Sequence, residues 1–210
     1  MGAKEEILGR IRAALADAPE PEAVPRDYRR HSELDSAQLI ELLSDRLVDY
    51  KAGVEVIEPE QVAQFVAAKL AGAASVVVPH GLETAWLAQL PQAVQRFTDA
   101  PEARLAVQQL DAVDAVVTSS RVSIAESGTI VLDGAPDQGR RAISLVPDHH
   151  VCVVPESSIV QLLPEAVARL DTTRPMTWIS GPSATSDIEL ERVEGVHGPR
   201  TLDVLIVRGL

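Results

Sequence analysis

The chain has 210 residues, of which 46% are hydrophobic and 24% charged, so it holds enough apolar material for one sizeable core. Its formal net charge of −12 repels nucleic acid and anionic lipid surfaces, so we expect neither as a partner. No apolar run approaches the roughly 18 residues of a membrane helix, and the first residues lack an apolar signal segment. These features predict a cytoplasmic protein without membrane insertion.

The N-terminal part of the chain predicts a helix and an arm. Residues 3–17 carry apolar side chains at helical spacing, which predicts an amphipathic helix. Three prolines within residues 19–25 predict an extended arm, and such an arm favours self-association into a homo-oligomer. A second helix is predicted over residues 35–50, capped at its start by Asp35 and ended by Gly53.

The rest of the chain alternates short apolar runs with helical patterns, as in an α/β domain with a mostly parallel sheet. Predicted strands lie at 54–57, 74–79, 104–107, 115–118, 151–154, 177–180 and 202–207. Predicted helices lie at 59–71, at 83–90, within 157–170 with Pro164 in the first turn, and from near Ser183. Residues 121–125 and 129–132 are so closely spaced that they predict an antiparallel hairpin. We therefore expect a helix and arm over 1–30 and a single α/β domain over 31–210, with helices flanking the sheet.

Cysteine and histidine content argues against a resident metal or redox group. Cys152 is the single cysteine, lies in an apolar run, and is interpreted as a small buried hydrophobe. His149 and His150 are adjacent in an extended segment, so their side chains point to opposite faces and cannot chelate together. No Gly-x-Gly-x-x-Gly motif is present. We expect no metal site and no cofactor.

Glu126 lies at the end of an apolar strand, next to a turn that contains Gly128. A carboxylate in this position is a candidate nucleophile or general base. The alternative is a solvated hairpin residue, with Gly128 supplying only the turn geometry, and spacing alone favours that alternative.

A strand, a glycine turn and a predicted helix start come together at residues 180–189. Ser180, Gly181, Ser183 and Thr185 there are candidate anion-binding residues, because a helix N-terminus offers unpaired N–H groups. The alternative is plain helix capping by Ser183, with carboxylates downstream complementing the helix dipole. Spacing alone does not decide between the two.

His197 and Arg200 share a glycine-bounded loop before the last strand. His197 is a candidate proton shuttle and Arg200 a candidate anion clamp, although a lone histidine is more often structural. Arg140, next to Arg141, is interpreted either as an outer ligand contact or as a solvated side chain.

Taken in chain order, these loops resemble the LUD domain of lactate-utilisation proteins. The matching segments are Glu126-Ser127-Gly128-Thr129, Gly139-Arg140-Arg141, residues 145–150, residues 179–189 and residues 195–200. The resemblance is strongest over residues 115–207. The family pattern usually has Thr where this chain has Ser127, a change that keeps the hydroxyl.

The resemblance implies a fold similar to the sugar-phosphate isomerase and CoA-transferase group. It also implies a role in oxidation of L-lactate to pyruvate together with iron-sulfur partner proteins. Since this chain shows no ligands for an electron carrier, we expect an accessory, non-redox component that binds a small carboxylate or other anionic metabolite. The alternative is an independent enzyme or binding protein for a phosphorylated or CoA-linked metabolite, with Glu126 as base or nucleophile. In either case the loops are expected to converge at one end of the sheet.

Overall fold

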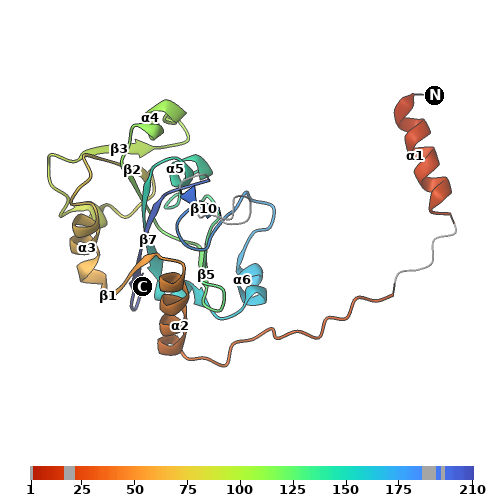
Figure 1. The fold of residues 1–210 in the computed structure, drawn as a ribbon, viewed down its shortest axis with the longest axis horizontal. Helices are drawn as coiled ribbons and strands as arrows, with labels where there is room; N and C mark the ends of the chain where they lie inside the picture. The colour runs from red at the N-terminus through yellow and green to blue at the C-terminus, as the bar shows by residue number, and fades with distance from the viewer. Residues whose placement is uncertain (1, 17–21, 186–192, 195–196) are drawn as a thin grey trace.

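The computed structural model describes residues 2–16, 22–185, 193–194 and 197–210, and its main body is built around two larger β-sheets (Figure 1). Helix α1 (Ala3–Ala14) lies apart from this body, and every residue of α1 is exposed (Figure 1). Among the helices that the structure describes, none is long and apolar enough to cross a membrane.

Helix α2 (Ser36–Asp49) begins at the predicted cap. The Asp35 carboxylate accepts a hydrogen bond from the Gln38 backbone N–H, and the Gln38 side chain accepts one from the Asp35 backbone N–H. The helix ends at Asp49 with Tyr50 as its C-cap, so its predicted range is confirmed, but the predicted role of Gly53 in ending it is wrong. Lys51 takes the left-handed conformation after the helix, with φ of 71°, and Gly53 already belongs to the first strand.

The main sheet has six strands, all parallel, in the order β1-β12-β7-β4-β2-β3. They are β1 (Gly53–Ile57), β2 (Ser75–Pro79), β3 (Gln95–Asp99), β4 (Ala115–Thr118), β7 (His149–Pro155) and β12 (Thr201–Val207). The central strands β2, β4 and β7 are almost entirely buried because both faces of the sheet are covered. This confirms the mostly parallel sheet flanked by helices.

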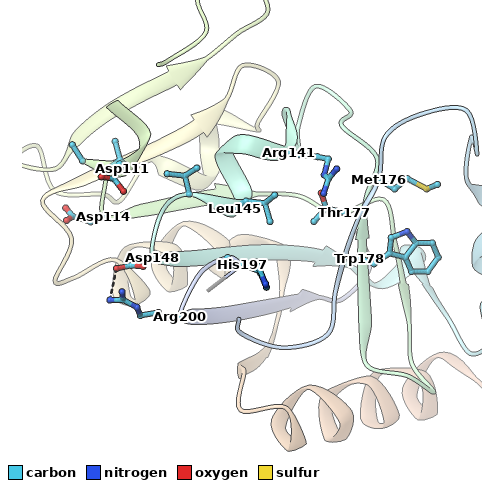
Figure 2. Close-up of a pocket in the computed structure, with 14 residues that line it drawn as sticks. Asp111, Asp114, Arg141, Leu145, Asp148, Met176, Thr177, Trp178, His197 and Arg200 are labelled. Carbon is cyan, nitrogen blue, oxygen red and sulfur yellow. Dashed lines mark hydrogen bonds and ion pairs between the residues drawn. The ribbon is translucent and has the colours of Figure 1, made fainter. Parts of the chain in front are cut away.

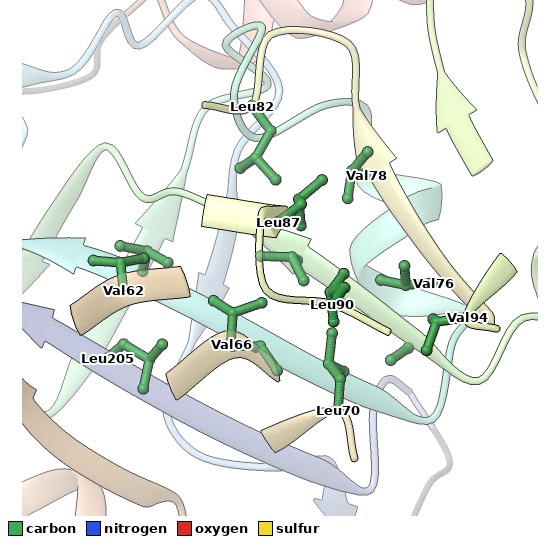
Figure 3. Packing of buried hydrophobic residues seen from close by; sticks show 14 of the residues in the cluster. Val62, Val66, Leu70, Val76, Val78, Leu82, Leu87, Leu90, Val94 and Leu205 are labelled. Carbon is green, nitrogen blue, oxygen red and sulfur yellow. The ribbon is translucent and has the colours of Figure 1, made fainter. Parts of the chain in front are cut away.

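One face of the main sheet is covered by α3 (Val62–Lys69) and the 3₁₀ helix η2 (Thr84–Leu87) (Figure 3). Val62 and Val66 of α3 belong to one buried cluster with Leu205 of β12. Burying a side chain of this size contributes about 1.5–3 kcal/mol, so this face is a major source of stability.

The opposite face is covered by α2 and the second sheet. Leu43 and Leu47 of α2 are fully buried in a cluster with Ile206 of β12 and Ile130 of the second sheet. Towards the other edge, α4 (Val107–Asp111) and α5 (Arg141–Leu145) cover β2 and β4 through a further cluster.

The second sheet has four strands in the order β8-β5-β6-β9. They are β5 (Val122–Ile124), β6 (Thr129–Leu132), β8 (Ile159–Val160) and β9 (Thr177–Ile179). Strands β5 and β6 form the predicted antiparallel hairpin, which β8 extends in parallel and β9 in antiparallel orientation. A short pair, β10 (Ala184–Thr185) with β11 (Val193–Glu194), lies between this sheet and β12 in the chain.

Three helical segments remain to be placed: η1 (Pro59–Gln61), η3 (Glu156–Ser158) and α6 (Leu163–Arg169). Pro164 lies in the first turn of α6, as predicted. The helix predicted within 157–170 is confirmed as α6. Before it, the β-branched pair Ile159–Val160 pairs with β5 as strand β8, which was not predicted.

Two further predictions are wrong. Residues 104–107 form no strand; they lead into α4, and the Leu105 backbone N–H donates to the Asp99 carboxylate. The edge strand β3 takes that place in the sheet. The helix predicted from Ser183 is also wrong at its start, where Ala184–Thr185 form β10, and residues 186–192 lie outside the described residues.

Candidate functional site

Two adjoining cavities lie at the amino ends of β4, β7 and β12, and together we call them the amino-edge cavity (Figure 2). The larger measures about 960 Å³ and the smaller about 230 Å³. We call the smaller one the inner cavity, because its lining includes the fully buried His150. The shared lining comprises Leu145, Thr177, Trp178, His197 and Gly198. The cavity is therefore bounded by α5, by β9 of the second sheet and by the loop before β12.

The loop before β12 is held in place by Ser183. The Ser183 backbone N–H donates to the Pro199 carbonyl at 2.8 Å, and the Ser183 hydroxyl accepts from the His197 backbone N–H at 3.0 Å. Arg200 forms an exposed ion pair with Asp148 at 3.2 Å, just before the adjacent strands β12 and β7 (Figure 2). Ser183 thus positions the loop that carries His197 and Arg200, a role different from helix capping.

A chain of hydroxyl groups links the hairpin to the inner cavity. Thr129 Oγ1 lies 2.8 Å from Ser127 Oγ and 2.8 Å from Ser180 Oγ, and Ser180 lines the inner cavity. Gly181 follows with φ of 85°, and a Cβ there would lie 2.5 Å from Cβ of Tyr50. Only glycine lets the chain turn this close to the end of α2.

The positive charge of the amino-edge cavity comes from Arg141 and Arg200, with His197 as a titratable group. Figure 2 shows Arg141 of α5 directed towards Thr177 of β9. Arg200 is paired with Asp148, so Arg141 is the guanidinium best placed to bind an anion. An arginine fork binds a carboxylate through two parallel hydrogen bonds.

Asp114, at the opposite side of the cavity, is held as a carboxylate. Its Oδ2 accepts hydrogen bonds from the Ser75 hydroxyl and from the backbone N–H groups of Ala74 and Ser75. The hydroxyl bond is the main reason that the pKa of Asp114 lies below its usual value, and burial opposes it. This carboxylate joins the starts of β2 and β4 and is a structural element of the rim.

The floor of the inner cavity is formed in part by His150, which is fully buried. Burial lowers the pKa of His150 to about 3, helped by the charge of His149, so the imidazole is neutral at physiological pH. Its Nε2 lies 2.7 Å from Thr118 Oγ1. His149 points the other way, to Asp203, as the prediction of opposite faces required.

Glu126 and Arg140 lie outside the amino-edge cavity. The Glu126 carboxylate is half exposed and pairs with Arg29 of the arm at 2.5 Å, and Glu126 lines neither part of the amino-edge cavity. Arg140 pairs with Asp99 near the carboxyl ends of β2 and β3. The structure therefore does not bring Glu126 and Arg140 together with His197.

Ser180, Gly181, Ser183, His197 and Arg200 do come together around the amino-edge cavity. The backbone of Thr185 lies in β10. These residues converge at the amino edge of the parallel strands, whereas ligand sites in open α/β sheets usually lie at the carboxyl edge.

Several cavity residues escaped the sequence reasoning. Arg141 is next to Arg140 in the sequence motif, but only Arg141 lines the amino-edge cavity. The direction of each side chain depends on the start of α5, where Arg140 is the N-cap and Arg141 the first helical residue. Trp178 is the one tryptophan in the lining, and its position in a short strand after a proline-containing loop was the available signal. Within the ranges that the structure describes, no group of three or more His, Cys, Asp or Glu side chains is arranged to hold a metal ion.

The fold and the cavity define an α/β protein with a parallel six-stranded sheet and a smaller mixed sheet. A cavity lies between the two sheets, at the amino edge of the parallel strands. Residues 34–207 match the model of the LUD domain, and the chain belongs to the LUD domain family.

The relatives agree with this assignment. Lactate utilization protein C of Deinococcus radiodurans is 44% identical over 209 residues, covering 98% of this chain and 95% of that protein. Lactate utilization protein C of Bacillus subtilis is 36% identical over 109 residues, covering 48% and 45%. A crystal structure of a DUF162 family protein from Deinococcus radiodurans superposes with a TM-score of 0.70 at 37% identity, covering 83% of this chain and 99% of that one.

Proposed function

We propose that this chain serves in lactate utilisation as an accessory component without a redox centre, and that its amino-edge cavity binds a small carboxylate. The observation that carries the role is the near full-length similarity to a protein named for lactate utilisation. More specifically, we propose an accessory role in the oxidation of L-lactate to pyruvate.

The cavity has the chemistry that a small hydroxy- or keto-acid requires. Arg141, in the larger part of the cavity, supplies a bidentate partner for the carboxylate, and the Ser180 hydroxyl adds a polar group to the smaller part. Leu145, Met176 and Trp178 provide apolar surface for the carbon skeleton.

Electron transfer in this proposal belongs to iron-sulfur partner proteins. Cys152 is the single cysteine and is fully buried, and burial raises the pKa of its thiol to about 12. Cluster ligation uses several thiolates. Cys152 therefore supports packing, and the partners supply the redox groups.

Growth on L-lactate tests the role in the cell. We expect deletion of the chain to abolish growth on L-lactate as sole carbon source while growth on glucose continues, and the intact chain to restore it. Pull-down of the tagged chain from lactate-grown cells should then recover proteins with iron-sulfur clusters. Undiminished growth of the deletion strain on L-lactate would contradict the proposed role.

Ligand binding tests the cavity. Isothermal titration of the purified chain with L-lactate and with pyruvate should show binding, and Arg141→Gln should weaken it about tenfold. Arg12→Gln, on the exposed helix α1, removes the same charge away from the cavity and should leave the affinity unchanged. Equal affinities in Arg141→Gln and the intact chain would refute the assignment of Arg141.

A further inference from the structure

A third cavity, of about 640 Å³, lies at the carboxyl ends of β2 and β3, where the turn of residues 133–139 crosses them. We call it the arginine cavity, because its lining includes Arg104, Arg140, Arg141 and Arg174. These residues come from three separate parts of the chain. The position is the edge of a parallel sheet at which ligands usually bind.

The turn over this edge is fixed to the ends of the strands. The Gly81 backbone N–H donates to the Pro136 carbonyl at 2.9 Å, and the Ser119 N–H donates to the Asp137 carbonyl at 3.0 Å. Gly139 has φ of 69°, and a Cβ there would clash with a side chain of α5. The cavity wall is therefore preorganised.

Two of the four arginines are positioned by buried carboxylates. Arg140 donates from Nε and Nη2 to the two oxygens of Asp99, both at 2.9 Å, and Asp99 is 4% exposed. Arg174 Nη1 lies 3.3 Å from Oδ2 of Asp133, which is also buried. Such pairs hold the guanidinium groups in one orientation, and both carboxylates, although almost fully buried, also line the cavity.

The cavity carries an excess of positive charge. Four guanidinium groups face two carboxylates, and among the residues that the structure describes Arg104 and Arg141 have no carboxylate partner within ion-pair distance. His80 adds a titratable imidazole to the lining. In a chain of net charge −12, a local cationic cavity of this kind is unexpected unless it meets an anion.

We propose that the arginine cavity binds the phosphate group of a phosphorylated metabolite. Several guanidinium forks offer more donors than one carboxylate accepts, whereas a phosphate presents three terminal oxygens and up to two charges. Pro101, Pro136 and Pro175 line the same cavity and provide apolar walls for the organic part. Arg141 lines both this cavity and the amino-edge cavity, whereas Arg104, Arg140 and Arg174 line only this one. The phosphate site does not rest on the function proposed for the amino-edge cavity.

Isothermal titration of the full chain with inorganic phosphate, with pyrophosphate and with citrate tests the proposal, at one ionic strength set with sodium chloride. We expect pyrophosphate to bind more tightly than citrate, and Arg104→Gln to weaken pyrophosphate binding about tenfold. Arg104 is exposed and holds no buried partner among the described residues, so this variant should keep the fold, which thermal unfolding checks.

Arg12→Gln is the matched control, since it removes the same charge from α1. It should bind pyrophosphate as the intact chain does. The proposal is overturned if the intact chain binds neither phosphate nor pyrophosphate, or if Arg104→Gln binds as tightly as Arg12→Gln. Citrate binding as tightly as pyrophosphate would overturn the phosphate specificity.

Discussion

Asp203 joins three elements, and its replacement by asparagine gives a pH-dependent test of the fold. Asp203 Oδ1 lies 3.0 Å from Nζ of Lys69 on α3, and Oδ2 lies 2.8 Å from Nε2 of His149 on β7. Burial opposes ionisation of this carboxyl, but the hydrogen bonds from His149 and Lys69 outweigh burial and hold its pKa below the usual value.

The expected loss follows from these contacts. A hydrogen bond to a charged group contributes about 1.5–3 kcal/mol, and asparagine keeps one acceptor oxygen but neither the charge nor the second acceptor. The side chains of Asp203 and Lys69 are only 13% and 22% exposed, so solvent screening is limited. We therefore expect Asp203→Asn to lower the free energy of unfolding by about 2 kcal/mol at pH 7, or roughly 4–8 °C in Tm for a chain of this size.

The pH dependence has a defined sign. Because the pKa of Asp203 is lower in the folded state, its contribution is complete above the unfolded pKa of about 3.9 and is lost as pH falls through the folded pKa. Urea unfolding at pH 7, 5 and 3.5 should show a constant difference between Asp203→Asn and the intact chain down to about pH 4, and a smaller one below it.

Asp27→Asn, on the exposed arm, removes the same charge without these contacts and should change stability by less than about 0.5 kcal/mol. The reasoning is refuted if Asp203→Asn loses no more unfolding free energy at pH 7 than Asp27→Asn does. It is also refuted if the loss in Asp203→Asn becomes smaller between pH 7 and pH 5.

Two further outcomes are expected from the described geometry. Gly181→Ala should destabilise the chain by about 1–3 kcal/mol in thermal unfolding, because a φ of 85° is strained for alanine and the new Cβ would approach Tyr50. Gly72→Ala is the control, since open space surrounds Gly72. Equal losses of stability in the two variants would contradict the argument. Cys152 should stay unreactive towards a chromogenic disulfide reagent at pH 8 until the chain is unfolded in guanidinium, since its thiol is fully buried with a pKa of about 12; rapid labelling of the folded chain would contradict this.

Strands buried on both faces were predictable from the sequence. Val76–Val78 and Val151–Val154 are apolar throughout, and both lie inside the main sheet. The edge strand β3 was not predictable in this way. Its residues Gln95–Asp99 are mostly exposed and polar, and they are a strand because they pair with β2, a contact 20 residues away in the sequence.

The candidate site shows the same division. The loop motifs at Ser180–Ser183 and His197–Arg200 identified the residues that meet around the amino-edge cavity. The sequence also supported the family resemblance, which the LUD domain match confirms. Those motifs alone do not identify the ligands that we propose, a carboxylate in one cavity and a phosphate group in the other.

What the sequence determined by itself was local: the buried strands, the capped helix α2, the β5-β6 hairpin and the polar loops, each set by neighbouring residues. Only the tertiary structure decided that the hairpin forms a second sheet with β8 and β9, that Glu126 pairs with the arm, and that Arg140 and Arg141 face partly different cavities. The reason is physical, because these outcomes depend on pairing and burial between segments far apart in the chain, which local periodicity does not encode.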